Sequence, residues 1–170
     1  MTDKKHADVC IVGGAGHVGL PMALSFANAG SRVQIYDINE KTLATIASGT
    51  MPFVDEGAEA YLRHALDNDL LTLTADPADI TPTGTLVITI GTPVDEFLNP
   101  SHSAVKSSID ALIPHITDAH LIVLRSTLYP GTTEWLHRYL QECGKKTRIS
   151  FCPERSVQGR AIKELSELPQ

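Results

Sequence analysis

A glycine-rich motif near the start of the chain has the spacing of a loop that can hold a diphosphate. Gly14-Ala-Gly16-His-Val-Gly19 follows an apolar run at residues 8–13 and opens a segment of helical period at residues 16–29. In this context Gly14 permits a tight turn, Gly16 lets a diphosphate approach the backbone, and Gly19 lets the helix lie close to the preceding strand. The N–H groups at the helix start supply positive charge, although the glycines can also serve backbone geometry alone and His17 can simply face solvent. The predicted dinucleotide loop consists of Gly14, Ala15, Gly16, His17, Val18 and Gly19.

An acidic residue follows the next apolar run at the distance expected of a ribose-binding group. Asp37 ends the run at residues 32–36, 18 residues after Gly19, and its carboxylate can accept hydrogen bonds from both ribose hydroxyls. A 2′-phosphate at about 4 Å would be repelled by about 4 kcal/mol at an effective dielectric constant of about 20. The site therefore favours NAD over NADP, although Lys41 could soften the repulsion. The alternative role for Asp37 is to cap the helix expected from Glu40, a role that suits Asn39 better.

Three further polar motifs follow apolar runs later in the chain. They are Gly91-Thr-Pro-Val-Asp95, Arg125-Ser-Thr-Leu-Tyr-Pro-Gly-Thr-Thr-Glu134 and Cys152-Pro-Glu-Arg-Ser-Val-Gln-Gly-Arg-Ala-Ile162. If the runs are parallel strands, these motifs lie at the same edge of the sheet as the glycine motif. Each one alone could also be a strand exit with a proline turn and a helix cap. Because a dinucleotide site does not specify a reaction, the chemistry must come from these motifs.

The elements that position the motifs alternate between short apolar runs and segments of helical period. Strands are expected at residues 8–13, 32–36, 70–74, 85–91, 120–125 and 147–152. Helices are expected at residues 16–29, 40–47, 56–67, 105–116 and 132–143. The first strand, helix and strand occupy so few residues that a right-handed parallel crossover is nearly forced. We therefore expect an α/β, Rossmann-type fold: an open, doubly wound, mostly parallel sheet with helices on both faces.

Composition and charge narrow the classes of function. The 170 residues include 14 Lys+Arg and 20 Asp+Glu, a formal net charge of −6, which predicts no nucleic-acid partner and no attachment to an anionic membrane. No apolar run approaches the roughly 18 residues that a membrane span needs. Cys10, Cys143 and Cys152 lack CxxC spacing, so they indicate free thiols rather than a disulfide framework or a metal site. We expect one cytoplasmic domain over residues 1–170.

In this order and spacing the motifs resemble the N-terminal NAD-binding domain of the UDP-glucose/GDP-mannose dehydrogenase family. The resemblance spans essentially the whole chain, and its specific parts are Arg125-Ser-Thr-Leu-Tyr-Pro-Gly-Thr-Thr133 and Pro153-Glu-Arg155 with Gly159-Arg-Ala-Ile-Lys-Glu-Leu165. The Pro-Glu-Arg sequence and the ending Glu164-Leu-Ser-Glu-Leu-Pro-Gln170 are most similar to the branch that oxidises UDP-N-acetylated hexosamines. UDP-N-acetylmannosamine and UDP-N-acetylglucosamine are the expected substrates on this basis.

The resemblance implies an NAD-dependent, four-electron oxidation of the C6 hydroxyl of a UDP-sugar to a carboxylate, for the synthesis of polysaccharide or surface-glycan precursors. It places Thr92, Ser126 and Thr127 toward the nicotinamide half of the cofactor, with Thr127 also a candidate catalytic residue. Glu154 matches the family's carboxylate near the reacting carbon, a candidate acid, base or water-orienting group. The alternative role for Glu154 is a charge at the entry to a helix. Arg155 and Ser156 would approach the UDP-sugar.

The family's cysteine nucleophile, and the lysine and asparagine that assist it, come downstream of the motifs seen here. Cys10 and Cys152 do not match its position, so the resemblance implies that this chain is the truncated N-terminal part of a longer enzyme. We expect it to bind NAD but to be inactive without the C-terminal portion, and the full-length protein to be a homodimer. Two departures are Gln158, where the UDP-glucose branch has a second glutamate, and Thr42, where an arginine is common.

Two other functions remain open from the residues. One is a two-electron, NAD-dependent hydroxyacid or hydroxyacyl dehydrogenase with the same first domain, against which the Thr-Pro, Ser-Thr and Pro-Glu-Arg motifs argue. The other is a stand-alone, non-catalytic NAD-binding module, for which 170 residues is a suitable length. A downstream coding segment that carries a cysteine would favour the enzyme, and a stop codon would favour the module.

Overall fold

The computed structural model describes residues 6–80, 83–91 and 103–167. Within these residues six strands form one sheet in the order β3-β2-β1-β4-β5-β6, and all five pairings are parallel. The strands are β1 (Val9–Val12), β2 (Val33–Tyr36), β3 (Leu71–Thr74), β4 (Thr85–Ile88), β5 (Leu121–Leu124) and β6 (Arg148–Phe151). This arrangement confirms the predicted doubly wound α/β fold.

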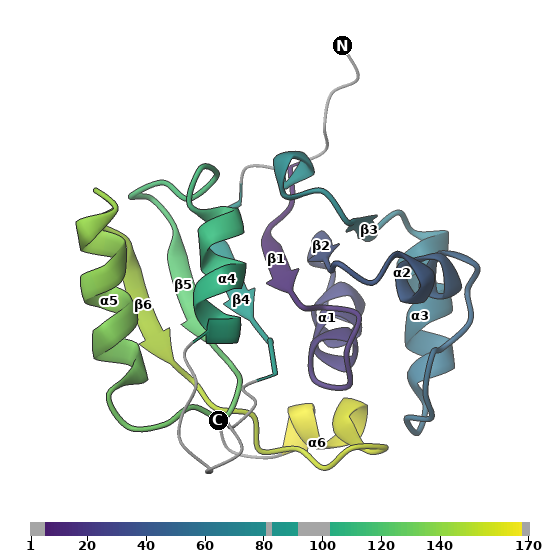
Figure 1. Cartoon of the computed structure of the whole chain (residues 1–170). Helices are drawn as coiled ribbons and strands as arrows, with labels where there is room; N and C mark the ends of the chain where they lie inside the picture. Colours follow the sequence, from purple (N-terminus) through teal and green to yellow (C-terminus); the bar gives the residue numbers. More distant parts are fainter. Residues whose placement is uncertain (1–5, 81–82, 92–102, 168–170) are drawn as a thin grey trace.

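Two layers of helices cover the sheet (Figure 1). The helices are α1 (Gly19–Asn28), α2 (Glu40–Ala47), α3 (Ala58–Asp67), a short 3₁₀ helix η1 (Pro77–Asp79), α4 (Ser103–Leu112), α5 (Thr132–Glu142) and α6 (Ala161–Glu167). Side chains of α1, α2 and α3 share one buried cluster with β1, β2 and β3, and those of α4 and α5 share a second with β4 and β5. In Figure 1, α6 lies at the end of the molecule toward which the strands point, beside α1.

Alternate residues of the central strands pack into the two clusters. On β1, Ile11 belongs to the cluster under α1 and Cys10 to the cluster under α4 and α5. On β4, Val87 belongs to the first cluster and Leu86 to the second. Because both faces of these strands are buried, their sequences read as continuous apolar runs rather than as alternating ones.

Several elements begin or end differently from the sequence prediction, for local reasons. The helix predicted from residue 16 begins at Gly19, because residues 16–18 belong to the turn in which the Gly16 N–H bonds to the Gly13 carbonyl. The helix predicted to reach residue 116 ends at Leu112, two residues before Pro114, which disfavours helical backbone at the residue before it. Asn39 caps α2, its side chain accepting a hydrogen bond from the Thr42 N–H, as expected. The elements η1 and α6 were not predicted.

The register of the sheet brings the carboxyl ends of its strands to one edge. Val12 at the end of β1 lies opposite Tyr36 on one side and Ile88 on the other. At the end of β5, Leu124 lies opposite Phe151. The residues that follow these five positions therefore emerge at the same edge of the sheet, which is where parallel α/β folds bind their ligands.

Within the described ranges every helix is too short or too polar to cross a lipid bilayer. The same part of the chain contains no group of three or more His, Cys, Asp or Glu side chains arranged to hold a metal ion.

Candidate functional site

The glycine motif forms a backbone turn between β1 and α1. The N–H of Gly13 donates to the Tyr36 carbonyl at 2.8 Å, which fixes the start of the turn against β2. Gly13 has φ +75°, in the left-handed region that favours glycine. The turn closes where the Leu20 N–H donates to the Gly16 carbonyl at 3.0 Å. No side chain caps the start of α1, so the first N–H groups of this helix have no side-chain partner.

The three glycines of the predicted motif are required for different reasons. A Cβ on Gly14 would lie 2.8 Å from the Ile11 carbonyl oxygen, and a Cβ on Gly19 would lie 2.5 Å from the Cα of Gly14. These two positions therefore need glycine because the protein packs tightly there. The nearest atom to a Cβ on Gly16 is the Gly13 carbonyl oxygen at 3.5 Å, an ordinary contact. The exposed Gly16 is thus left open toward the outside, as a loop that admits a diphosphate to its backbone requires.

Asp37 lies directly beside this turn. Its Oδ2 accepts a hydrogen bond from the Ala15 N–H at 3.0 Å, and its Oδ1 accepts one from the Asn39 N–H at 2.9 Å. Each carboxylate oxygen can accept a further hydrogen bond. The predicted ribose-binding group and the predicted diphosphate-binding turn are therefore adjacent, as a dinucleotide requires.

A cavity of about 450 Å³ lies where the turn, β2, β4 and α4 meet. Its walls include Gly16, Asp37, Thr89, Ile90 and Ser107. The cavity sits beside β1, at the point where the chain stops adding strands on one side of the sheet and begins on the other. Ligands of doubly wound sheets bind at this position, and the volume is in the range of small-molecule sites. The residues present thus fit a dinucleotide.

Thr89 is a residue of this cavity that the sequence prediction missed. Its hydroxyl lies 2.9 Å from the Val12 carbonyl and 3.0 Å from the Gly13 carbonyl. A hydroxyl has one proton, so it donates to one of these carbonyls at a time and braces the start of the glycine turn. The only signal in the sequence is a threonine within the apolar run predicted as a strand at residues 85–91.

The structure describes two of the three residues that were predicted to contact the nicotinamide half of the cofactor. Thr92 lies outside the described residues. The Ser126 hydroxyl donates to the Ile90 carbonyl, so it joins the ends of β5 and β4. Thr127 follows it and is exposed at the same edge. Their roles toward a cofactor stay predictions.

Glu154 is held by a buried arginine that the sequence prediction did not assign. Nη2 and Nε of Arg125 lie 3.0 and 3.1 Å from Oε2 of Glu154, and the two side chains are 5% and 9% exposed. The other oxygen, Oε1, accepts hydrogen bonds from the N–H groups of Arg155 and Ser156, both at 2.7 Å. Glu154 therefore stabilises the turn after β6. Its predicted catalytic role stays a prediction.

The same contacts set the protonation state of Glu154. Burial raises the pKa of its carboxyl group, but hydrogen bonds from Ser156 and Arg155 and the charge of Arg125 outweigh burial, so the pKa lies below its ordinary value. Glu154 is therefore ionised at neutral pH. Arg155 is exposed and Ser156 is half-buried beside it. These two predicted substrate residues come directly after Glu154 in the sequence, and the carboxylate of Glu154 is held in place.

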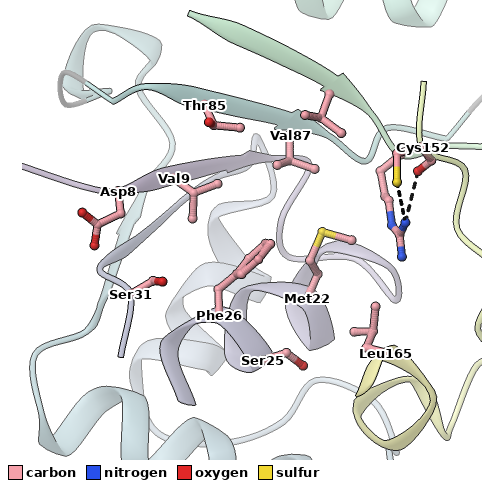
Figure 2. Close-up of a pocket in the computed structure, with 12 residues that line it drawn as sticks. Asp8, Val9, Met22, Ser25, Phe26, Ser31, Thr85, Val87, Cys152 and Leu165 are labelled. Carbon is pink, nitrogen blue, oxygen red and sulfur yellow. Dashed lines mark hydrogen bonds between the residues drawn. The ribbon is translucent and has the colours of Figure 1, made fainter. Parts of the chain in front are cut away.

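A second cavity of about 450 Å³ lies between α1 and strands β1, β4 and β5 (Figure 2). Its walls are mainly apolar and include Met22, Phe26 and Val87. Figure 2 shows Cys152 and Leu165 at one end of it. Its walls contain neither Asp37 nor any residue of the glycine turn, so this cavity is separate from the predicted dinucleotide site.

Comparisons with known proteins agree with this geometry. Residues 7–170 match the sequence model of the UDP-glucose/GDP-mannose dehydrogenase family, NAD-binding domain. The chain is 31% identical over 173 residues to a UDP-N-acetyl-D-mannosamine dehydrogenase of Methanococcus maripaludis, and the match covers 96% of this chain and 39% of that protein. The chain thus spans about two fifths of the length of the curated relatives that it matches.

Two solved structures have the same fold. The chain is similar to the UDP-D-ManNAc dehydrogenase of Pyrococcus horikoshii, with a TM-score of 0.86 and 28% identity, over 92% of this chain and 38% of that one. It is also similar to a GDP-mannose dehydrogenase of Pseudomonas aeruginosa, solved as a ternary complex, with a TM-score of 0.86 and 25% identity over 93% of this chain and 38% of that one. The family match also bears out NAD as the cofactor. The chain therefore belongs to the UDP-glucose/GDP-mannose dehydrogenase family, within its NAD-binding domain.

Proposed function

We propose that this chain is the N-terminal, cofactor-binding part of a longer enzyme that oxidises the C6 hydroxyl of a UDP-N-acetylhexosamine to a carboxylate. The observation that carries the cofactor-binding role is the junction of the glycine turn with Asp37 at the carboxyl edge of the sheet, and the family match over residues 7–170 supports the reaction class. The relatives named UDP-N-acetyl-D-mannosamine dehydrogenase favour UDP-N-acetylmannosamine as the substrate, and UDP-N-acetylglucosamine is the second candidate. The product would be a uronate precursor of a polysaccharide or surface glycan.

The chain's own residues bind and orient the cofactor in this proposal. NAD⁺, when bound, supplies the acceptor for the hydride that leaves the sugar C6 carbon. The N–H groups of the glycine turn and of the start of α1 hold the diphosphate. Asp37 holds the adenosine ribose, and its charge disfavours a 2′-phosphate. Thr92, Ser126 and Thr127 would contact the nicotinamide half of the cofactor, and Thr127 is the candidate among them for contact with the reacting groups.

The turn after β6 faces the substrate in this proposal. Arg155 would bind charged oxygens of the UDP-sugar, because a guanidinium forms strong hydrogen bonds with them, and Ser156 would add a hydroxyl contact. Glu154 would act as a base or a water-orienting group at the sugar rather than as an acid, because an ionised carboxylate has no proton to donate. Its lowered pKa suits the ionised form, and Arg125 fixes the direction of its carboxylate.

The remaining chemistry belongs to the C-terminal portion of the same protein. That portion would supply the cysteine nucleophile and the rest of the sugar site, and the full-length protein would be a homodimer. Cys10, Cys143 and Cys152 are free thiols, which suits the reducing cytoplasm, and we place the protein there. The isolated chain would bind NAD⁺ and turn over no sugar.

Calorimetric titration and an absorbance assay test this proposal. The purified chain should bind NAD⁺ more tightly than NADP⁺ and should form no NADH with UDP-N-acetylmannosamine. A longer protein that includes the downstream coding sequence should form two NADH per UDP-N-acetylhexosamine. Failure of the chain to bind NAD⁺ would overturn the proposal, as would a longer protein that oxidises a hydroxyacid with one NADH instead. NADH formation by the isolated chain would overturn its assignment as an incomplete enzyme.

A further inference from the structure

Asp55 is a buried carboxylate that does not line the dinucleotide cavity. Its residue is 2% exposed, and no ion pair within the described residues involves it. Its Oδ2 accepts a hydrogen bond from the Ala161 N–H at 3.0 Å, and its Oδ1 accepts one from the Ile162 N–H at 3.2 Å. Both donors belong to the first turn of α6. Asp55 therefore caps a helix that begins 106 positions later in the chain.

The backbone beside Asp55 makes a second link to the same region. The Glu56 N–H donates to the Gly159 carbonyl at 2.9 Å. Gly159 has φ +89°, so the chain turns sharply there before entering α6. The segment at residues 55–56 thus holds the chain at residues 159–162 through both a side chain and the backbone.

The loop that carries the proposed substrate residues is held at each end by a carboxylate. At its start, Glu154 is bound by Arg125, which directly follows β5. At its end, Asp55 binds the first N–H groups of α6. Arg155 and Ser156 lie between these two buried carboxylates, so the position of the loop depends on both of them.

The segment that contains Asp55 also touches the glycine turn. The ring of Phe53 stacks on the ring of His17, with centroids 4.1 Å apart and planes 20° apart. Stacked aromatic rings at this separation attract each other. His17 occupies one of the variable positions of the glycine motif, so the segment at residues 53–56 contacts the predicted dinucleotide turn at one end and the start of α6 at the other.

We propose that Asp55 is a positioning residue that fixes the Arg155–Ser156 loop relative to the dinucleotide turn, so that NAD⁺ binding and the order of this loop are coupled. The inference rests on the proposed function, which takes Arg155 and Ser156 to contact the sugar nucleotide. NAD⁺ at the glycine turn restricts His17 and, through Phe53, the segment that carries Asp55. A carboxylate serves this purpose better than an amide, because both of its oxygens accept hydrogen bonds.

Hydrogen–deuterium exchange of the 170-residue chain, with and without NAD⁺, tests the proposal. The variants are Asp55→Ala and Asp55→Asn, with Glu56→Ala as the matched control, because Glu56 is exposed and only its backbone N–H makes the contact with Gly159. Asp55→Ala should speed exchange at residues 155–162 by about tenfold, the usual scale for a lost helix cap, and leave β1 and α1 within about twofold. NAD⁺ should slow exchange at residues 155–162 in the natural chain but not in Asp55→Ala.

The conservative variant separates positioning from general stabilisation. Asp55→Asn keeps one accepting oxygen, so it should restore part of the protection and part of the NAD⁺ response, and it carries the comparison if Asp55→Ala does not fold. Unchanged exchange at residues 155–162 would overturn the proposal, and so would a rise spread evenly over the sheet. An NAD⁺ response that persists in Asp55→Ala would also overturn it. If the natural chain does not bind NAD⁺, the proposed function fails. The hydrogen–deuterium exchange measured without NAD⁺ still decides whether Asp55 holds the loop in place.

Discussion

The carboxylate of Asp37 accepts a hydrogen bond from the backbone N–H of Ala15, with 3.0 Å between Oδ2 and the nitrogen. The two groups are 22 positions apart in the chain, and each was predicted separately to contact the same ligand. The protein itself therefore joins the predicted ribose-binding side chain to the predicted diphosphate-binding turn. Removal of this carboxylate should affect both halves of the predicted site.

We expect Asp37→Ala to weaken NAD⁺ binding by at least about tenfold, since hydrogen bonds to charged groups contribute about 1.5–3 kcal/mol each. NADP⁺ binding should weaken less or improve, because the repelling charge is gone. Isothermal titration with both nucleotides measures the change. Glu40→Gln is the control, an exposed acid nearby that lies outside the cavity walls. If the natural chain bound both nucleotides equally and Asp37→Ala left both affinities unchanged, this account of cofactor choice would be contradicted.

Gly16→Ala and Gly19→Ala should separate binding from folding. The Cβ of Gly19→Ala would lie 2.5 Å from the Cα of Gly14. Thermal unfolding should therefore show a loss of stability of about 1–3 kcal/mol. Gly16→Ala has space for its Cβ, and its stability should change by no more than about 0.5 kcal/mol. The same variant should weaken NAD⁺ binding by about tenfold or more, because the methyl group occupies the path of the diphosphate. Normal NAD⁺ affinity in Gly16→Ala would contradict the assigned contact.

Acid should destabilise the chain through Glu154. The pKa of this carboxyl group is held below its ordinary value of 4.5, so its ionised form stabilises the folded state at every pH above that value. This contribution is lost as the pH falls through the lower, folded-state pKa. Urea unfolding between about pH 6 and pH 3 should therefore show a steeper acid loss in the natural chain than in Glu154→Gln.

At neutral pH the same variant should be less stable by about 3–5 kcal/mol, since it leaves Arg125 buried without its carboxylate. Glu142→Gln is the control, because Glu142 is exposed at the end of α5. Identical acid profiles for Glu154→Gln and the natural chain would show that the ion pair does not contribute to stability.

Cys10 should resist alkylation in the folded chain. Burial raises the pKa of its thiol to about 12 despite a hydrogen bond with the backbone of Tyr36, which lowers it, and the residue is 0% exposed. Only about one thiol in ten thousand would then be ionised at pH 8. Iodoacetamide followed by peptide mass spectrometry should modify Cys143 and Cys152, which are partly exposed, and should modify Cys10 only in denaturant. Modification of all three thiols at similar rates would contradict the buried position of β1.

The sequence predicted the parts of the site whose signals are local. Apolar runs predicted central strands such as β1 and β4, because strands covered on both faces exclude polar side chains, whereas the edge strand β6 contains Arg148 and Ser150 and is largely exposed. The turn between β1 and α1 and the place of Asp37 directly after β2 were predicted correctly because both depend on residues nearby in the sequence. The prediction that Asn39 rather than Asp37 caps α2 is confirmed, since the Thr42 N–H donates to Asn39 Oδ1. Its signal is also local.

The parts that were missed depend on contacts between distant segments. Residues Gly159 and Arg160 before α6 offer no side-chain cap of the usual kind, and the cap comes instead from Asp55, 106 positions earlier. Nothing in the neighbourhood of Arg125 indicates that its partner is Glu154, 29 positions later. Such pairings follow from the order of the strands in space, which periodicity alone does not determine.

The walls of the dinucleotide cavity among the described residues include no lysine or arginine. Attraction for a dianion must then come from peptide dipoles at close range, in a chain whose formal net charge is −6. Added salt screens distant charges far more than groups in direct contact. The affinity for the cofactor should accordingly change little with ionic strength, and the surface of the domain is free to remain acidic without a cost to nucleotide recognition.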